Sequence, residues 1–134
     1  MIDLEDVHVL IVDDDELILT MASDIISSRL PYKVHAVNSG LECLNFLDRK
    51  IPHIDLLLVD VFMPGMDGFE TLSKARQVLG YEKLPVILLT AATDRNTVMK
   101  ASQLQVQGYV KKPFNANVLA EKVASVVMKA AFEE

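Results

Sequence analysis

The feature that most constrains this chain is an apolar run, Leu56–Val59, that ends on a single acid, Asp60. A turn rich in proline and glycine follows at once. A short continuous apolar run bounded by turn residues is typical of a strand buried on both faces, as in a parallel sheet. Asp60 then lies at the carboxyl end of the strand, where open α/β sheets bind ligands. Asp60 could instead cap the next helix, but Asp67 is better placed for that, so we interpret Asp60 as the reactive residue.

Length and composition narrow the class of protein. The chain has 134 residues, from which we expect one domain over 1–134 with its core at about 7–131. The formal net charge of −6, without a cluster of Lys or Arg, argues against nucleic acid as a partner. No apolar run is long enough to cross a membrane, and no signal pattern opens the chain. The single cysteine, Cys43, lies among leucines, which favours a buried thiol in a reducing cytoplasm over a nucleophile.

Four further segments are predicted to be strands. Val7–Val12 repeats the pattern of Leu56–Val59, because an apolar run again ends on acids, here three of them. Tyr32–Val37 alternates between apolar and polar residues, and Pro85–Leu89 is an apolar run followed by Thr90. Gln107–Val110 is predicted to be a short fifth strand.

Five segments with helical spacing alternate with these strands. The second begins at Ser39 with the Ser-x-x-Glu pattern of a capping box and runs to about Asp48. The third begins at Asp67 and is predicted to end near Gly80, the fourth covers 94–102, and Asn115 caps the last. The apolar stripes comprise Ile18, Met21, Ala22, Ile25 and Ile26, then Phe69, Leu72, Ala75 and Leu79, and finally Leu119, Val123, Val126, Val127 and Ala130. The alternation predicts an α/β fold, with helices on both faces of a parallel sheet.

Functional side chains follow four of the predicted strands. The carboxyl ends of parallel strands share one edge of the sheet, so Asp13, Asp14, Asp60, Thr90 and Lys112 are expected to converge there. Three crowded carboxylates raise one another's pKa values, and a divalent cation removes that penalty. Carboxylate oxygens suit Mg²⁺, so the sequence predicts a magnesium site.

The acidic run 13–15 also has a simpler interpretation, as a solvated helix start that the helix dipole favours. One acid suffices for that, and either Asp15 or Asp14 can supply it. We therefore keep Asp13 and Asp14 as the predicted metal pair.

Four motifs in this order resemble the response-regulator receiver domain of two-component signalling. The motifs are Val12-Asp13-Asp14, Asp60 followed by Met63-Pro64-Gly65-Met66-Asp67-Gly68, Thr90-Ala91, and Tyr109 with Lys112-Pro113-Phe114. The resemblance runs from Val7 to the last predicted helix. Within the family, the chain is similar to the single-domain chemotaxis regulators. It implies a doubly wound, flavodoxin-like sheet of five strands in the order 2-1-3-4-5.

The resemblance also implies a chemistry. Asp60 would take a phosphoryl group from the phosphohistidine of a sensor histidine kinase or a histidine phosphotransfer protein. Mg²⁺ would be the cofactor, held directly by Asp14, largely through water by Asp13, and by Asp60 and the backbone carbonyl of Phe62. Lys112 would contact a phosphoryl oxygen as a point charge. Lys111 competes for this role, but the lysine of the family directly precedes the proline.

Further roles follow by resemblance at matching positions. Thr90 would donate its hydroxyl to the phosphoryl group, and Tyr109 would switch inward, although it can equally be an ordinary tyrosine at a strand edge. The peptide bond before Pro113 is expected to be cis. Phe62 and Ala92 flank the approach of a hydrolytic water, and because neither can hold one, we expect slow loss of the phosphoryl group.

Three other classes of protein compete with this interpretation. An aspartate-nucleophile phosphatase needs a second aspartate where this chain has Phe62. A receiver-like interaction module without phosphorylation need not keep the five residues of the edge. A flavodoxin-like cofactor protein needs a phosphate-binding Gly-rich loop, which the sequence lacks. The resemblance implies a phosphoacceptor rather than an enzyme, with a phosphorylation-dependent protein target or output domain as its partner, and the chain could be free-standing or a fragment. The scattered His8, His35 and His53 are interpreted as structural or solvated.

Overall fold

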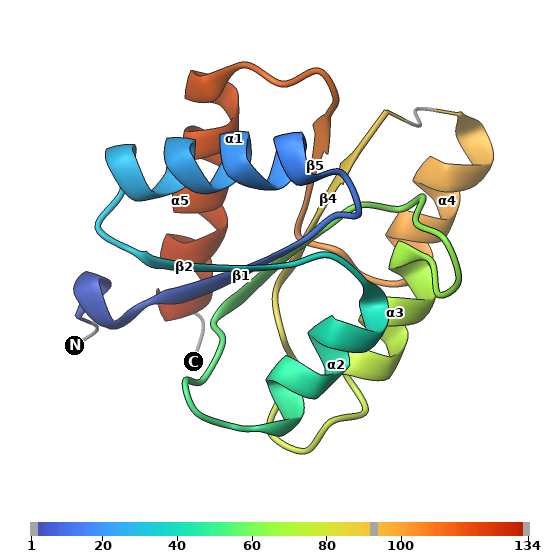
Figure 1. The fold of residues 1–134 in the computed structure, drawn as a ribbon, viewed down its shortest axis with the longest axis horizontal. Coiled ribbons are helices and arrows are strands. Elements are labelled where there is room, and N and C mark those ends of the chain that lie inside the picture. Colours follow the sequence, from blue (N-terminus) through green and yellow to red (C-terminus); the bar gives the residue numbers. More distant parts are fainter. Residues whose placement is uncertain (1–2, 92–93, 133–134) are drawn as a thin grey trace.

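A computed structural model describes residues 3–91 and 94–132, in which strands and helices alternate along the chain (Figure 1). The strands are β1 (His8–Val12), β2 (Lys33–Val37), β3 (Leu56–Val59), β4 (Val86–Thr90) and β5 (Gly108–Lys111). The helices are α1 (Glu16–Arg29), α2 (Gly40–Asp48), α3 (Gly68–Ala75), α4 (Arg95–Gln103) and α5 (Ala116–Phe132), with a short 3₁₀ helix, η1 (Leu4–Asp6), before β1.

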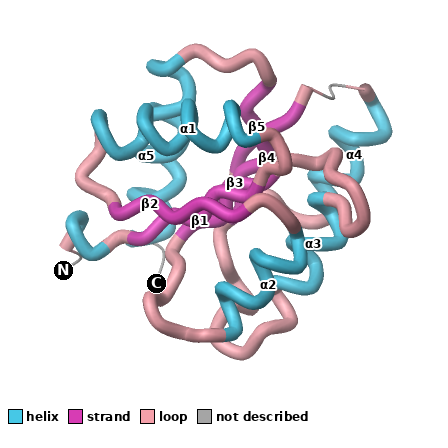
Figure 2. The backbone as a smooth tube through the Cα atoms, viewed as in Figure 1, coloured by secondary structure: helices cyan, strands magenta, loops and turns pink. Residues whose placement is uncertain are grey.

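The five strands form one sheet in the order β2-β1-β3-β4-β5, and every neighbouring pair is parallel. Helices α1 and α5 lie side by side on one face of the sheet, and α2 and α3 pack together on the other, as Figures 1 and 2 show. This is the doubly wound arrangement predicted from the sequence. All carboxyl ends of the strands therefore meet at one edge.

The apolar run of β3 is continuous because both of its faces are buried. Leu57 and Val59 pack into the core cluster on the side of α2 and α3, whereas Leu56 and Leu58 pack into the cluster on the side of α1 and α5. All four side chains are fully buried. Burial of one such side chain stabilises a fold by about 1.5–3 kcal/mol, so this strand anchors both layers.

The predicted helix starts are confirmed by their hydrogen bonds. Asp15 accepts from the backbone N–H groups of Leu17 and Ile18 at the start of α1. Ser39 and Asp67 cap α2 and α3 in the same way. Because Asp15 caps α1, Asp14 has no capping duty and its carboxylate faces solvent.

Two details of the predicted helices are wrong. Helix α3 ends at Ala75 and not near Gly80, so Leu79 is 79% exposed instead of lying on the inner side. Beyond Ala75 the chain tightens into turns with hydrogen bonds three residues apart, from Gln77 N–H to Lys74 O and from Val78 N–H to Ala75 O. The guanidinium of Arg76 holds this turn by donating to the carbonyls of Leu84 and Gln105. Met21 of α1 is likewise 42% exposed, because Leu19 takes the buried position on that helix.

Cys43 is fully buried, and burial raises the pKa of its thiol to about 12. The interpretation as an inert core thiol is confirmed. Within the described ranges no helix combines the length and the apolar character needed to cross a bilayer.

The histidines are less scattered than their sequence positions suggest. Parallel pairing of β1 with β2 brings His8 Nδ1 to 2.8 Å from His35 Nε2, with the two ring planes parallel to within 10°. The short separation is that of an N–H···N hydrogen bond, in which one ring donates and the other accepts. The sequence shows no sign of this pair because the two residues come from different strands.

Candidate functional site

Backbone hydrogen bonds fix the carboxyl edge of the sheet. The N–H of Asp60 donates to Val12 O at 3.0 Å, which places Asp60 beside the end of β1. The N–H of Lys112 donates to Thr90 O at 2.9 Å, which places the lysine beside the end of β4. The strands thus bring together residues that are far apart in the sequence, as predicted.

One lysine joins two buried carboxylates at this edge. Asp13 is fully buried and Asp60 is 6% exposed. Lys112 Nζ lies 2.6 Å from Asp13 Oδ2 and 3.1 Å from Asp60 Oδ2. A buried carboxylate needs such a partner, because the loss of water around an isolated charge costs several kcal/mol.

The pKa values of the two partners respond to this environment. Burial and then the charge of Asp13 raise the pKa of the Asp60 carboxyl, and Lys112 and the N–H of Phe62 oppose them only in part. Burial alone lowers the pKa of Lys112, but the hydrogen bond and charge of Asp13, with Asp60, outweigh it and raise that pKa. The lysine therefore stays charged beside the two carboxylates.

The carboxylates form a donor set for a divalent cation. One oxygen each from Asp13, Asp14 and Asp60 lie within 4.8 Å of one another. Carboxylate oxygens are the ligands that Mg²⁺ takes, usually with several waters, and exposed Asp14 leaves room for them. The residues present therefore fit the metal implied by the resemblance, while the division of direct and water-mediated ligands stays a prediction.

Gly68 is a positioning residue that the sequence interpretation did not single out. A Cβ atom at this position would lie 2.1 Å from Asp60 O and 2.8 Å from Val61 Cα, so no larger residue fits. Its N–H also donates to Val61 O at 2.8 Å. The start of α3 is thereby packed directly against the backbone of Asp60 and Val61. An Asp-Gly pair directly after the predicted turn was the available signal.

Thr90 and Tyr109 lie where the sequence placed them. Thr90 is fully buried at the end of β4. Tyr109 of β5 is half-buried against the core cluster below α3 and α4, and its hydroxyl is buried with no hydrogen-bond partner among the described residues. Burial, and then the charge of Asp94, raise the pKa of this hydroxyl.

Three remaining predictions concern the loops. The Lys112–Pro113 peptide bond is cis, as predicted, and a second cis bond, at Ile51–Pro52, was not anticipated. Phe62 is 63% exposed, while its backbone N–H donates to Asp60 Oδ1 at 3.4 Å. Ala92 lies outside the described residues. The roles of Phe62 and Ala92 in hydrolysis stay predictions.

A doubly wound sheet that gathers carboxylates and one lysine at its carboxyl edge defines a receiver-like class of protein. The family model for the response regulator receiver domain matches residues 9–124. The chain therefore belongs to the response regulator receiver domain family.

Relatives of this chain include transcriptional regulatory and chemotaxis proteins. The transcriptional regulatory protein AfsQ1 of Streptomyces coelicolor is 33% identical over 92% of this chain and 52% of its own length. The chemotaxis protein CheY of Pseudomonas aeruginosa is 40% identical over 55% of this chain and 60% of its own length. The chain spans about half the length of the first curated relatives that it matches.

Solved structures of the same fold include chemotaxis regulators. The chemotaxis protein CheY4 of Vibrio cholerae has a TM-score of 0.82 and 29% identity, covering 90% of this chain and 98% of that chain. A CheY-like receiver domain from Methanospirillum hungatei has a TM-score of 0.85 and 26% identity, covering 96% of this chain and 98% of that chain. The order 2-1-3-4-5 is thus the receiver fold.

Proposed function

We propose that this chain is a phosphoacceptor in a two-component system and that Asp60 receives the phosphoryl group. The observation that carries the proposal is the salt-bridged Asp13–Lys112–Asp60 arrangement, with Asp14 completing a set of three carboxylates. A domain that served only as a scaffold would have no need to bury two carboxylates and a lysine together, since such burial is a weak source of stability. An unphosphorylated interaction module is the alternative that the experiment below must exclude.

The transfer step is a simple displacement. An Asp60 Oδ attacks the phosphorus of a phosphohistidine on a sensor kinase or histidine phosphotransfer protein. The new P–O bond forms as the P–N bond breaks, and the imidazole nitrogen keeps the electron pair and takes a proton from solvent. Positioning and charge neutralisation, more than covalent work, lower the barrier of such transfers.

The residues around Asp60 divide the work. Asp13 and Asp14, with Asp60 and the carbonyl of Phe62, would hold Mg²⁺, which when bound supplies positive charge to the phosphoryl oxygens. Lys112 keeps its positive charge and needs to move only from Asp60 Oδ2, 3.1 Å away, to a phosphoryl oxygen. Thr90 donates its hydroxyl to another oxygen. We propose that the protein assists its own phosphorylation without being a turnover enzyme.

Tyr109 links this site to a partner surface. Its buried hydroxyl lacks a hydrogen bond among the described residues, and such an unpaired group costs about 1–3 kcal/mol. The hydroxyl of Tyr109 is thus already buried without phosphorylation, and not only after an inward switch. Because this buried position is costly, a shift of Thr90 toward the phosphoryl group can change the position of the tyrosine. We propose that the face made by α4, β5 and α5 then binds a protein target or output domain in the cytoplasm, with no role for nucleic acid or membrane contact by this domain.

The proposal is tested by labelling with acetyl phosphate in the presence of Mg²⁺. Intact-mass spectrometry should show one added phosphoryl group on the parent protein and none on Asp60→Asn. Asp67→Asn is the matched control, because Asp67 lies in the same loop but caps α3. Labelling of Asp60→Asn to the parental extent would show that the chain is not a phosphoacceptor at this residue.

A further inference from the structure

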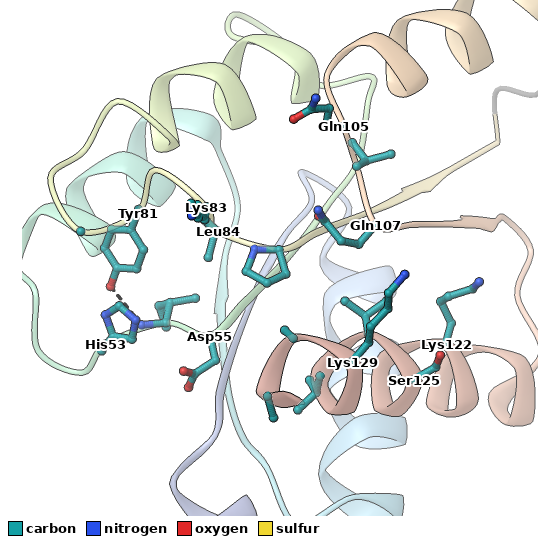
Figure 3. Close-up of a pocket in the computed structure, with 18 residues that line it drawn as sticks. His53, Asp55, Tyr81, Lys83, Leu84, Gln105, Gln107, Lys122, Ser125 and Lys129 are labelled. Atoms are coloured by element: carbon teal, nitrogen blue, oxygen red, sulfur yellow. Dashed lines mark hydrogen bonds between the residues drawn. The ribbon is translucent and has the colours of Figure 1, made fainter. Parts of the chain in front are cut away.

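A cleft of about 730 Å³ lies at the amino edge of the sheet, opposite the edge that holds Asp60 (Figure 3). One wall is formed by the segments that lead into β3, β4 and β5, and the other by the second half of α5. Buried apolar side chains, among them Leu84, Val126 and Val127, form its floor. Nothing in the phosphotransfer chemistry uses this part of the molecule.

The cleft is basic although the chain as a whole is acidic, with a formal net charge of −6. Three lysines line it: Lys83, Lys122 and Lys129. Among residues 3–91 and 94–132, none of the three forms an ion pair with Asp or Glu. Asp55 is the acidic lining residue, and its Oδ2 already accepts a hydrogen bond from the N–H of His8. The cleft therefore has an excess of uncompensated positive charge.

Two of the lysines are arranged by α5. Lys122 and Lys129 are seven residues apart, which puts them on the same face of the helix about 10.5 Å apart along its axis. Figure 3 shows both rising from α5 on the side of Gln107. The stem of Lys122 lies over Gly108 so closely that a Cβ there would be 3.0 Å from Lys122 Cδ. Part of the Lys122 stem is thus packed on β5, and this side chain is less exposed than that of Lys129.

A fixed amide adds hydrogen-bond donors. Gln107 Oε1 accepts from the N–H of Val86 at 2.7 Å and from Arg76 Nη2 at 3.4 Å. These contacts assign the oxygen, and among the described residues the amide NH₂ donates to no other group, so its donors are left for a ligand. The guanidinium of Arg76 also adds positive charge next to the cleft.

We propose that this cleft binds a short acidic peptide segment of a partner protein. An enclosed small-molecule site buries most of its ligand, whereas Lys83, Gln105, Ser125 and Lys129 are exposed and leave the cleft open. Cations about 10.5 Å apart match carboxylates spread along a peptide better than one compact phosphate. The apolar floor suits small side chains between those carboxylates. The inference is independent of phosphorylation at Asp60.

The test uses the unphosphorylated protein and a short fluorescein-labelled peptide of alternating glutamate and alanine. Fluorescence anisotropy should show saturable binding that weakens as salt is added. The double variant Lys122→Gln with Lys129→Gln should lose about tenfold in affinity, since it removes both surface ion pairs that these lysines would form with the peptide. Asp55→Asn should bind more tightly, because it removes the carboxylate from the cleft and keeps an acceptor for the N–H of His8.

The control is the double variant Lys33→Gln with Lys74→Gln, which has the same net charge but alters β2 and α3. It should bind the peptide as the parent does, and an equal loss would reduce the effect to overall charge and overturn the proposal. Amide NMR shifts on peptide addition should centre on Gln107, Gly108 and Ser125. Shifts centred on Gly68 instead, or binding of inorganic tripolyphosphate without binding of the peptide, would also overturn it.

Discussion

The two ends of the same parallel strands carry opposite kinds of charge. At the carboxyl edge, Asp13 is fully buried and Lys112 joins it to Asp60. At the amino edge, Lys122 and Lys129 stand in an open cleft without ion pairs among the described residues. Buried charges must be compensated within the protein, whereas exposed ones are compensated by water or by a partner. This difference agrees with the two proposals, phosphotransfer at the carboxyl edge and peptide binding at the amino edge.

Removal of the cation should have the largest effect, and only at the carboxyl edge. With excess chelator, labelling by acetyl phosphate should disappear, because the three carboxylates would repel the incoming phosphoryl group without a divalent cation. Binding of the acidic peptide at the amino edge should be unchanged. Undiminished labelling in excess chelator would contradict the requirement for Mg²⁺.

Replacement of Lys112, which bridges Asp13 and Asp60, should allow phosphorylation but weaken the target binding that depends on it. Lys112→Ala leaves the three carboxylates in place, so Mg²⁺ should still bind, but the phosphoryl group then lacks its point charge. The affinity of the phosphorylated variant for a phosphorylation-dependent target, measured by titration, should fall by tenfold or more, on the order of 1.4 kcal/mol. Lys111→Ala is the matched control, because Lys111 is exposed next to it in the chain. Loss of coupling in the control alone would assign the role to Lys111.

The lifetime of the phosphorylated form tests the loop beside Asp60. Phe62 has no group that can orient a water, so Phe62→Asn should speed hydrolysis by about tenfold, or about 1.4 kcal/mol in the barrier. Phosphate release from the purified phosphoprotein in Mg²⁺ measures it. Because Phe62 is 63% exposed, an outward-facing ring that only contacts a partner is the competing interpretation. Phosphate release from the variant that is equal to or slower than that from the parent would favour the outward-facing ring.

Mild acid should lower the free energy of unfolding through His35 of β2, and this is the smallest of the expected effects. Burial, then the charges of His8 and Arg49, lower the pKa of His35. The unfolded chain consequently binds the proton first, and the free energy of unfolding should fall as the pH drops below about 6.5, the ordinary pKa of histidine. Denaturant midpoints at several pH values should show a weaker pH dependence for His35→Gln than for the parent. His53→Gln is the control, and an equal change there would assign the effect elsewhere.

The two edges also differ in how far the sequence revealed them. Asp13, Asp60 and Thr90 each directly follow an apolar run, so parallel-strand geometry alone predicted that they converge. Lys112 was placed by the same logic, and the motifs around it predicted the cis bond before Pro113. The chemistry of the carboxyl edge was visible because strand and functional residue are adjacent in the chain.

The features that the sequence did not predict depend on contacts between segments that are distant in the chain, and no local sequence pattern indicates such contacts. The cleft joins Lys122 to Gly108, and the histidine pair joins β1 to β2. The early end of α3, in turns that Arg76 ties to the carbonyls of Leu84 and Gln105, goes against the apolar spacing of Leu79. Such features follow from packing and required the folded chain.

Chemical trapping of the phosphorylated residue tests the central claim most directly. Protein treated with acetyl phosphate and Mg²⁺ is reduced with borohydride, which converts an acyl phosphate on aspartate to homoserine, and the peptides are sequenced by mass spectrometry. Homoserine should appear at position 60 and not at Asp13, Asp14 or Asp67. Conversion at one of those aspartates, or at none in a protein that retains the native fold, would contradict the assignment of Asp60 as the phosphoacceptor.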